Sequence, residues 1–598
     1  MIENIVELGK LMKGNKDEVF YSNINIDKDD SKKNYVEEIV FEYKTNDCKV
    51  SGILQSVNKM NSKDVSKYYH WIGNTRANYP KIRVTSDNFY NVECSLPNIL
   101  KKLKNKNSDL YQKISWVVEN YFEEKEEDGK KVMKIRPDRI DKNNQIRVIK
   151  EVKLYTIKIG DELICKHEEY LDLIKGTVMP DENLYVNGVC SICMKNDKVT
   201  SDTSHLQFKY YVTDKFSFAS NFESFENNLS LCKECYENAI YGENFILKNF
   251  HIKFDKDDLV IIPRAIIEGP NSLECLDYAY KFTKTSINGQ VEDFSNFRAL
   301  IKNQEENCKI FFVINLLFYK SGNQSFKVNH LIQDVSLFNV EKINRELEES
   351  RTLVDTFDYS INLSSLYGLL KWKDREVAMN YIIKIFKGED IDKGRLINDF
   401  MQSEKARMHE KNISKKDSYE QFLLMIKFIF FMINMQLFKY DNEVMRFMDN
   451  ELNDGSKRPE DAIIEKLGLD EQRESLVRLG FLISQISYAQ YNSGLKNSPI
   501  LEKINFNGTD IKGIMRLVTS VEEKMKQYKL FYYKTNVMDL QKLNLVIARD
   551  ANQWGLNNNE NIFYIMSGYS ILMAKIIKSS PEKAENEEIE VNETDVEL

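Results

Sequence analysis

The sequence lacks the short motifs that mark several large classes of enzyme. It contains no GxxxxGK(S/T) phosphate-binding loop, no HExxH zinc-protease helix, no GxSxG nucleophile turn and no convincing GxGxxG fingerprint. Histidine is scarce, with 6 in 598 residues, and no two histidines stand at the spacing of metal ligands. We therefore predict that the chain is not an enzyme and that it binds partners rather than converting a small molecule.

The sequence also lacks a segment that is typical of a membrane span. Its most apolar stretch, residues 422–438, is shorter than a typical span and is interrupted by Lys427, Asn434 and Gln436. We predict a buried core helix there. The first residues form no apolar secretory signal, and the cysteines, four of which stand in two CxxC pairs, indicate a reducing compartment. The sequence thus predicts a cytoplasmic protein without membrane contact.

Proline and glycine are few, at 9 and 23 residues, whereas phenylalanine and tyrosine number 33 and 31. This composition excludes a largely disordered chain and supplies apolar side chains for more than one core. The net charge of −8 is unevenly placed, because residues 581–598 hold eight acids and one lysine. The rest of the chain is close to neutral and can still present a basic face, so charge neither supports nor excludes binding of nucleic acid.

The periodicity of apolar residues divides the chain into a mixed front part and a helical rear part. Residues 130–158 alternate apolar and charged side chains as hairpin strands do, and residues 308–320 have the continuous apolar character of a buried strand. From about residue 346 nearly every segment has a helical period. We predict an α+β fold, in which a mixed α/β N-terminal region with an inserted four-cysteine zinc-finger module precedes an all-α C-terminal region ending in a helical bundle.

A chain of 598 residues predicts three or four domains. The pattern places their limits as follows: a mixed α/β N-terminal domain at 1–185, a zinc-finger module at 186–250, a continuation of the α/β region at 251–345, a helical region at 346–455, a C-terminal four-helix-type bundle at 456–579 and a disordered acidic tail at 580–598.

The strongest chemical signal is a pair of cysteine knuckles. The sequence CSIC, Cys190 to Cys193, is followed after 38 residues by CKEC, Cys232 to Cys235. Two residues between cysteines let a tight turn aim both thiolates at one metal, and two such turns complete a tetrahedral site of four thiolates. A closed shell of four thiolates leaves no open position for a substrate, so we predict one structural zinc ion. A redox pair or four unrelated buried cysteines are the alternatives.

His205 lies between the knuckles and is a candidate fifth ligand or nuclease base. Nucleases of the HNH fold also bracket their catalytic strand and helix with CxxC pairs. They need a paired acid–His or His–His step, and this insert contains a single histidine. A plain loop role is the alternative that we favour.

Three segments combine cations with aromatic or amide side chains, a composition that suits phosphate contact, base stacking and base-edge contact. Each has a structural alternative, namely a small aromatic core in the insert or a solvated strand or loop face elsewhere. The candidate residues are Asn74, Arg76, Lys81 and Arg83 in one loop; Lys130, Lys131, Lys134, Arg136 and Arg139 in a basic segment; and Lys209 and Lys215 in the insert.

The cysteine module resembles the zinc-finger segment of the large subunit of type I-B CRISPR Cascade, the eighth Cas protein family, subtype b. Members of that family show CSIC, an F-K-x-Y-x-T-D-K-x-x-F stretch, and a CxxC followed shortly by a glycine. A segment around Asp334 and Val335 also resembles the family, although the proline that often follows is missing. The matching positions in the module are Phe208, Lys209, Tyr211, Thr213, Asp214, Lys215, Phe218, Cys232, Cys235 and Gly242.

The resemblance implies a non-catalytic subunit of an RNA-guided complex. Such a subunit contacts the 5′ end of the crRNA and other Cascade subunits, recognises the protospacer-adjacent motif in target double-stranded DNA, and recruits a separate helicase–nuclease. The helical end is similar to the family's small-subunit-like bundle, which an internal start at Met445 or Met448 would also produce alone. In that bundle, Lys512, Arg516, Lys524 and Lys526 would support a DNA strand.

Two other functions stay open from the residues alone. An HNH-like nuclease would use His205 and would cleave DNA when a divalent metal is added. A zinc-ribbon scaffold of another RNA-processing complex would bind protein partners without any dependence on a short DNA motif.

Overall fold

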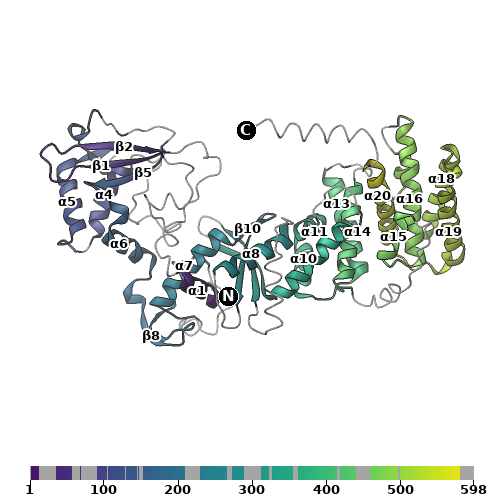
Figure 1. Ribbon diagram of the computed structural model, residues 1–598, viewed down its shortest axis with the longest axis horizontal. Helices are drawn as coiled ribbons and strands as arrows, with labels where there is room; N and C mark the ends of the chain where they lie inside the picture. Colours follow the sequence, from purple (N-terminus) through teal and green to yellow (C-terminus); the bar gives the residue numbers. More distant parts are fainter. Residues whose placement is uncertain are drawn as a thin grey trace.

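The computed structural model describes residues 2–12, 35–56, 68, 91–103, 105–127, 130–143, 146, 152–208, 229–265, 273–288, 312–321, 326–354, 361–411, 413, 418–438, 458–495 and 498–578. These residues form an elongated molecule, with residues 35–178 at one end and residues 458–578 at the other (Figure 1). The predicted acidic tail lies outside the described residues.

A four-stranded sheet in the order β2-β1-β5-β6 organises the first part of the chain. Strand β1 pairs antiparallel with β2 and parallel with β5, and a parallel pair requires a long crossover connection. Helices α4 and α5 lie in this crossover and share a core with the sheet, where the Phe41 and Tyr121 rings meet edge to face at 5.3 Å. The elements are β1 Tyr35–Phe41, β2 Val50–Ser56, α4 Asn91–Lys102, α5 Asp109–Tyr121, β5 Val152–Ile159, β6 Glu162–Leu163 and α6 Glu168–Val178.

The predicted hairpin over residues 130–158 is wrong in its pairing. Strand β4 (Lys130–Ile135) pairs with the preceding strand β3 (Phe122–Glu127), and β5 belongs to the other sheet. Tyr155 and Ile157 of β5 are buried, whereas the charged β3–β4 hairpin buries few side chains. Alternation predicts strands correctly, but the partner of β5 is decided by burial against β1, more than a hundred residues away in sequence.

A second sheet is an antiparallel meander in the order β10-β11-β12-β13. The predicted buried strand is confirmed, since β12 side chains from Val313 to Tyr319 are buried. Helix α8 packs on β11 of this sheet. The elements are β10 His251–Phe254, β11 Asp257–Ala265, α8 Leu273–Asn288, β12 Phe312–Ser321 and β13 Phe326–Ser336.

The first helix, α1 (Ile2–Met12), lies in the middle of the molecule against α7 (Lys233–Asn249) (Figure 1). The two backbones touch through glycines. A Cβ built on Gly9 would lie 1.8 Å from the carbonyl oxygen of Asn238, and one built on Gly242 would lie 1.9 Å from that of Ile5. Only glycine permits this approach, because any Cβ would have to displace backbone atoms.

The rear half is helical, which confirms the mixed fold with a helical C-terminal region. Helix α14 covers most of the predicted apolar segment and is confirmed as a core helix, with Lys427 buried and its Nζ donating to the carbonyl oxygen of Arg351 at 3.1 Å. No helix in the described part of the chain is long and apolar enough to span a membrane. The helices are α10 Leu337–Arg351, α11 Leu363–Leu370, α12 Arg375–Lys387, α13 Lys393–Lys411 and α14 Tyr419–Asn434.

Helix α16 is the centre of the last bundle and packs against α17, α18, α19 and α20. Its crossing with α20 repeats the glycine arrangement of α1 and α7. A Cβ on Gly480 would lie 2.1 Å from the oxygen of Ile565, and one on Gly568 would lie 2.0 Å from that of Val477. The elements are α15 Pro459–Lys466, α16 Glu471–Asn492, α17 Pro499–Glu502, α18 Ile511–Gln527, the 3-10 turn η11 Leu530–Tyr532, α19 Lys534–Asp550 and α20 Asn558–Lys578.

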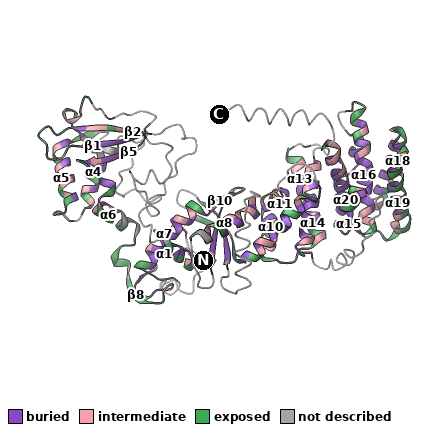
Figure 2. Ribbon diagram, viewed as in Figure 1, coloured by how far each residue is buried: buried purple, intermediate pink, exposed green. Residues whose placement is uncertain are grey.

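In the described part of the chain, buried side chains form two core clusters. One joins the first sheet to the cysteine module, and the other runs from the second sheet through the helices to α20. Helix α1 contributes Val6 to the first cluster and Ile5 and Leu8 to the second. Buried residues line α16 and α20, whereas α18 and α19 expose much of their surface at the outer end (Figure 2). The domain limits given above stay predictions.

Candidate metal centre and cationic surfaces

Two short backbone turns place the four cysteines. The first knuckle follows β7 (Val186–Val189), where the Cys190 N–H donates to the carbonyl oxygen of Lys195 at 3.0 Å and the Met194 N–H donates to that of Cys190 at 2.9 Å. Met194 adopts a left-handed φ of 56° that closes this turn before β8 (Asn196–Thr200). The second knuckle is the end of β9 (Leu231–Cys232), which runs directly into α7, so that Cys232 caps the helix and Cys235 lies in its first turn.

Hydrogen bonds between serines hold the two knuckles together. The Ser191 N–H donates to the carbonyl oxygen of Ser230 at 2.7 Å, and the Ser230 N–H donates to Ser191 Oγ at 2.9 Å. The Ser230 hydroxyl in turn donates to the carbonyl oxygen of Val189 at 2.6 Å. These contacts join chain segments 39 residues apart and fix the distance between the two cysteine pairs.

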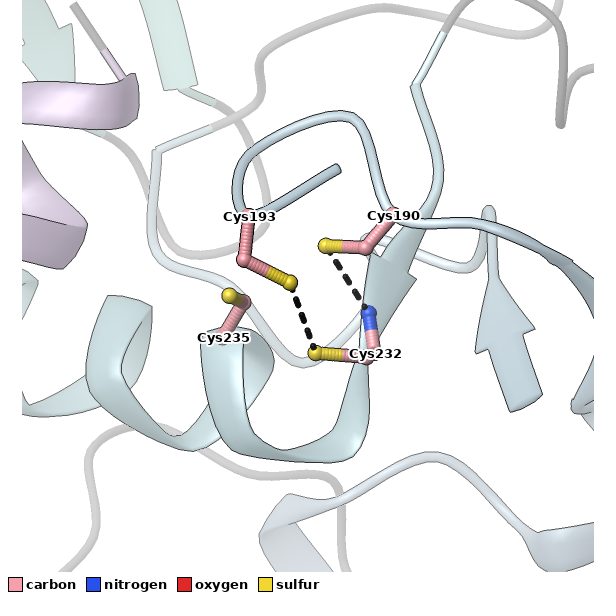
Figure 3. A group of neighbouring side chains, drawn as sticks. All are labelled: Cys190, Cys193, Cys232 and Cys235. Carbon is pink, nitrogen blue, oxygen red and sulfur yellow. Dashed lines mark hydrogen bonds between the residues drawn. The ribbon is translucent and has the colours of Figure 1, made fainter. Parts of the chain in front are cut away.

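The four thiol groups converge on one point (Figure 3). Their Sγ atoms all lie within 4.8 Å of one another, and the Sγ atoms of Cys193 and Cys232 are 3.8 Å apart. A tetrahedral zinc site with Zn–S bonds of about 2.3 Å has sulfur–sulfur edges of about 3.8 Å. The same separation is far too long for a disulfide, whose S–S bond is about 2.05 Å. The cysteines therefore form a group of the right size and chemistry to hold one metal ion.

The surroundings of the thiols favour the thiolate form in part. Burial opposes ionisation of Cys190, but backbone N–H groups, including that of Cys232 at 3.4 Å, outweigh burial and lower the pKa of the Cys190 thiol to about 7. Burial and the neighbouring Cys190 thiolate raise the pKa of Cys235. A divalent cation reverses this mutual opposition, because it stabilises all four thiolates at once.

The knuckles are anchored to the insert and to the second sheet through α7. The Glu243 carboxylate accepts hydrogen bonds from the backbone N–H groups of Gln207 at 2.6 Å and Phe208 at 3.3 Å. Phe208 is buried, and its ring meets Tyr319 of β12 edge to face at 6.4 Å. Phe208 is thus a core residue, but it packs in the cluster of the second sheet rather than in a small aromatic core of the insert. The other aromatics of the insert lie outside the described residues.

His205 is not a fifth ligand of this group. It lies exposed in a turn after β8, and among the described residues the cluster of close ligand atoms consists of the four cysteines. A metal ion bound by all four thiolates has no free coordination position. It can stabilise the fold but cannot bind a catalytic water.

A second group of potential ligands lies in the first domain, where Asp109, Glu162 and His167 approach one another within 4.8 Å. Lys113 occupies the position that a cation would take, with its Nζ 2.6 Å from Asp109 and 2.7 Å from Glu162. The hydrogen bond to Lys113 lowers the pKa of Asp109, and hydrogen bonds to the two carboxylates raise the pKa of Lys113. This group is an ion-pair network rather than an open metal site.

The basic segment of the first domain faces acidic neighbours. In the β3–β4 hairpin, Lys131 stands opposite Glu126 and its Nζ lies 3.2 Å from Glu124, while Lys134 stands opposite Glu123. Lys130 stands opposite Glu127 in the backbone register. The acids of β3 reduce the positive potential of this surface, since opposite charges on paired strands offset one another.

Two arginines of the same segment are engaged close by. Arg136 donates to the carbonyl oxygens of Phe122 at 3.0 Å and Glu119 at 3.2 Å. Arg139 lies 3.5 Å from Asp138. Their positions serve the hairpin and its junction with α5, and the predicted nucleic-acid role of the segment stays a prediction. The candidates Asn74, Arg76, Lys81, Arg83, Lys209 and Lys215 lie outside the described residues.

The cations of the last bundle have a different setting. Lys512 and Arg516 are exposed on α18, where the Arg516 guanidinium donates to the carbonyl oxygen of Lys512 at 3.3 Å. Lys524 is half-buried and donates to the Gln527 side chain at 2.6 Å. None of the three forms an ion pair with a carboxylate of the described residues. They remain able to contact an external anion.

Sequence reasoning missed a buried charge network in this bundle. The guanidinium of Arg478 lies 2.7 Å from Asp539 and 3.0 Å from Asp461, and Arg458 also binds Asp539 at 2.7 Å. The Arg478 and Asp539 side chains are 6% and 2% exposed. An arginine inside the apolar face of a helical segment is the one sequence signal for such a network, but it does not reveal which acid is the partner.

Models of the three domains of CRISPR-associated protein TM1802 match consecutive parts of the chain. The N-terminal domain model matches residues 1–175, the central domain model residues 187–335, and the C-terminal domain model residues 361–583. The central match contains all four clustered cysteines, and the C-terminal match contains the whole last bundle. No curated protein matches the chain.

Proposed function

The chain belongs to the family of CRISPR-associated protein TM1802, and we propose that it is the non-catalytic large subunit of a type I-B Cascade complex. The family membership confirms the resemblance to a Cas large subunit and gives the protein a role in CRISPR defence, together with other Cas proteins and crRNA. The observation that carries the proposal is that the three family domains match in order along most of the chain.

In the proposed complex the guide RNA reads the target sequence by base pairing, while this subunit reads a short protospacer-adjacent motif on the duplex. The subunit contacts the 5′ end of the crRNA and helps to open the DNA. A separate helicase–nuclease then binds the complex and cuts. Each of these steps takes place in the cytoplasm and needs binding surfaces on this chain rather than a catalytic centre.

We propose that the cysteine cluster holds one structural zinc ion, with Cys190, Cys193, Cys232 and Cys235 as its ligands. The tetrahedral size of the cluster and the serine contacts between its knuckles support this assignment. The zinc would tie β7–β8 to the start of α7, and through α7 to both cores. Its role would be to hold both ends of the insert between the knuckles. This insert contains the residues that match the family, of which Phe208 is the first.

The absence of catalysis is part of the proposal. Among the described residues, the cysteine cluster has a closed ligand set and the Asp109–Glu162–His167 group is bridged by Lys113. Neither arrangement provides the open coordination position that metal-assisted hydrolysis uses. An HNH-like nuclease therefore finds less support than a binding subunit.

The α18 cations Lys512 and Arg516 are proposed to hold a DNA strand. They are exposed and have no acidic partner in the described residues, unlike Lys131 on the β3–β4 hairpin. Phosphate contacts of this kind supply affinity without reading sequence.

The test is duplex binding by the assembled complex. The chain, its guide RNA and the partner Cas subunits are purified together, and affinity is measured for a matched duplex with and without the adjacent motif. We expect tight binding only with guide and motif, and a linear fall of log affinity with log salt. Motif-independent binding would remove the reading role from this subunit, and a flat salt dependence would exclude a role in phosphate contact.

Charge-reversal variants compare the two cationic surfaces. Lys512→Glu with Arg516→Glu should weaken binding for all sequences and reduce the salt slope by about 2, because two phosphate contacts are lost. Lys131→Glu with Lys134→Glu is the matched control on the hairpin that faces acids. A larger loss of DNA affinity in the hairpin variant would show that the DNA-binding surface lies in the first domain instead.

A nuclease assay and a pull-down separate the rival functions. The chain alone with added Mg2+, Mn2+ or Zn2+ should leave duplex and single-stranded DNA intact, whereas an HNH-like nuclease would cut it. A zinc-ribbon scaffold of another RNA-processing complex would co-purify with protein partners and show no guide RNA.

A further inference from the structure

The cationic part of the last bundle, which we name the α18 surface, is more positive than the rest of that bundle. Between residues 512 and 534 six cations stand against the acids Glu522 and Glu523. The cations of the α18 surface are Lys512, Arg516, Lys524, Lys526, Lys529 and Lys534, and none of them forms an ion pair with a carboxylate in the described chain.

The α18 surface also exposes large apolar side chains. Tyr532 is 84% exposed, Tyr533 is 60% exposed and Met515 is 46% exposed. Exposed tyrosine and methionine side chains beside lysines form a surface that suits an acidic partner with apolar side chains of its own. Other cations of the bundle are paired with acids, as Arg478 is with Asp539 and Lys575 is with Glu460.

The same chain contains a segment with the complementary composition. Residues 581–598 hold eight acids and one lysine, and they alternate acidic with apolar side chains in the run Glu588, Ile589, Glu590 and Val591. Alternating acidic and apolar residues are typical of segments that fold or dock onto basic, partly apolar surfaces. The charge of this segment, −7, exceeds the excess of four cations on the α18 surface.

The covalent connection is long enough for the segment to reach the α18 surface. Helix α20 ends at Lys578 and packs on α16, and α16 packs on α18 (Figure 1). Two neighbouring helix axes are about 8–10 Å apart, so the α18 axis lies roughly 20 Å from that of α20. Eighteen extended residues span up to about 60 Å.

We propose that the acidic segment 581–598 docks on the α18 surface of its own chain and competes there with the phosphate backbone of nucleic acid. The competition rests on the proposed function, in which the α18 surface holds a DNA strand, whereas the docking does not. The tether keeps the segment at an effective concentration of about 1 mM near the surface. A weak contact therefore suffices to reject loosely bound polyanions until the assembled complex presents a strand at higher local concentration.

The docking is tested on the full chain by carbodiimide cross-linking, which joins a carboxylate to a lysine in direct contact. In low salt we expect cross-linked peptides that join residues 581–598 to Lys512, Lys526 or Lys529. Cross-links that are absent, or that reach only lysines elsewhere, overturn the docking. The variant Lys512→Glu with Lys526→Glu should lose most of these cross-links, and cross-linking that persists at Lys529 with undiminished yield would contradict an electrostatic contact.

The competition is tested with a 30-nucleotide single-stranded DNA of mixed sequence. A variant in which the eight acids of residues 582–597 become glutamine or asparagine should bind about tenfold more tightly than the unchanged chain at low salt, and the ratio should shrink as salt rises. In the Lys512→Glu, Lys526→Glu background the same neutralisation should change affinity by less than about twofold. An equal ratio in both backgrounds overturns competition at this surface.

The two ideas fail in different ways. If the segment cross-links to the α18 surface but no variant binds DNA, the docking stands and the proposed DNA role of the surface is wrong. If DNA binds at the α18 surface but neutralisation leaves the affinity unchanged, the DNA role stands and the competition is wrong.

Discussion

The α1–α7 crossing and the α16–α20 crossing use the same backbone device at two distant places. Each brings two helices into backbone contact through a reciprocal pair of glycines, Gly9 with Gly242 and Gly480 with Gly568. The polar groups beside the crossings differ. The first crossing lies next to four converging thiols, and the second lies next to a buried arginine–aspartate network.

The two crossings illustrate two ways to stabilise a helix pair: a metal site of four thiolates and a buried ion-pair network. A metal bound by four thiolates supplies folding free energy directly, because the ligands have no comparable alternative in the unfolded chain. A buried ion pair supplies little net free energy, because desolvation offsets most of the attraction, but removing one partner is costly. With the proposed zinc bound, the four thiols would add stability, whereas the arginine–aspartate network mainly penalises wrong packing.

The largest expected effect comes from Cys232→Ser. The variant should lose its zinc and destabilise the cysteine module, with a loss on the order of 5 kcal/mol or more, because the metal supplies folding energy there. Zinc content by atomic emission and amide exchange in α7 measure both effects. Cys48→Ser is the matched control, since serine can still donate to the carbonyl oxygen of Thr45 as the thiol does at 3.3 Å. Less than about half an equivalent of zinc in the unchanged protein would contradict an occupied site.

Asp539→Ala should rank next. It leaves the buried guanidinium of Arg478 and that of Arg458 without their shared partner, and breaking such a network costs about 3–5 kcal/mol. Denaturant unfolding followed by amide exchange in α19 measures the loss. The exposed Arg549, 2.7 Å from Asp550, provides the control, because Arg549→Ala should cost less than about 1 kcal/mol. Equal effects from both variants would show that burial of the network is energetically irrelevant.

Replacing one glycine at either crossing by alanine should lower the stability of the protein by a similar amount, but only one of the two variants should also lower its zinc content. Gly242→Ala and Gly480→Ala each force a Cβ into a backbone carbonyl, at a cost of about 1–3 kcal/mol or more. Only Gly242→Ala should also lower zinc occupancy, because α7 carries Cys235. Gly368→Ala is the control, since no atom lies within 4 Å of its Cβ and alanine favours the helix by about 1 kcal/mol. Loss of zinc in Gly480→Ala would contradict the claim that only the α1–α7 crossing supports the cysteine cluster.

The smallest expected effect is a difference between the pH at which zinc is released and the pH at which the last bundle loses stability. Burial raises the pKa of Asp461, but Arg458 and Arg478 outweigh it and hold the pKa below its ordinary value. A lowered folded-state pKa contributes stability that is present above about pH 4 and is lost as pH falls through the folded-state value. Thiolates are far more basic, so zinc should leave at a higher pH than that at which the bundle weakens. Parallel pH titrations of zinc release and α19 amide exchange check the order.

The sequence alone predicted the parts whose cause is local. The CxxC spacing places two thiols on one turn whatever the rest of the chain does, and the apolar runs at 308–320 and 422–438 predicted the buried strand β12 and the core helix α14. The helical rear half followed from periodicity for the same reason. Gly242 was singled out only by family resemblance, and the structure supplies its physical reason in the contact with Ile5.

Tertiary structure decided which distant segments meet. It paired β5 with β1 rather than with β4, brought α1 from the start of the chain against α7, and set the acids of β3 opposite the lysines of β4. It also chose Asp539 as the partner of Arg478 and Arg458. These pairings depend on which arrangement of the whole chain buries the most apolar surface. They therefore cannot be predicted from any short stretch of sequence.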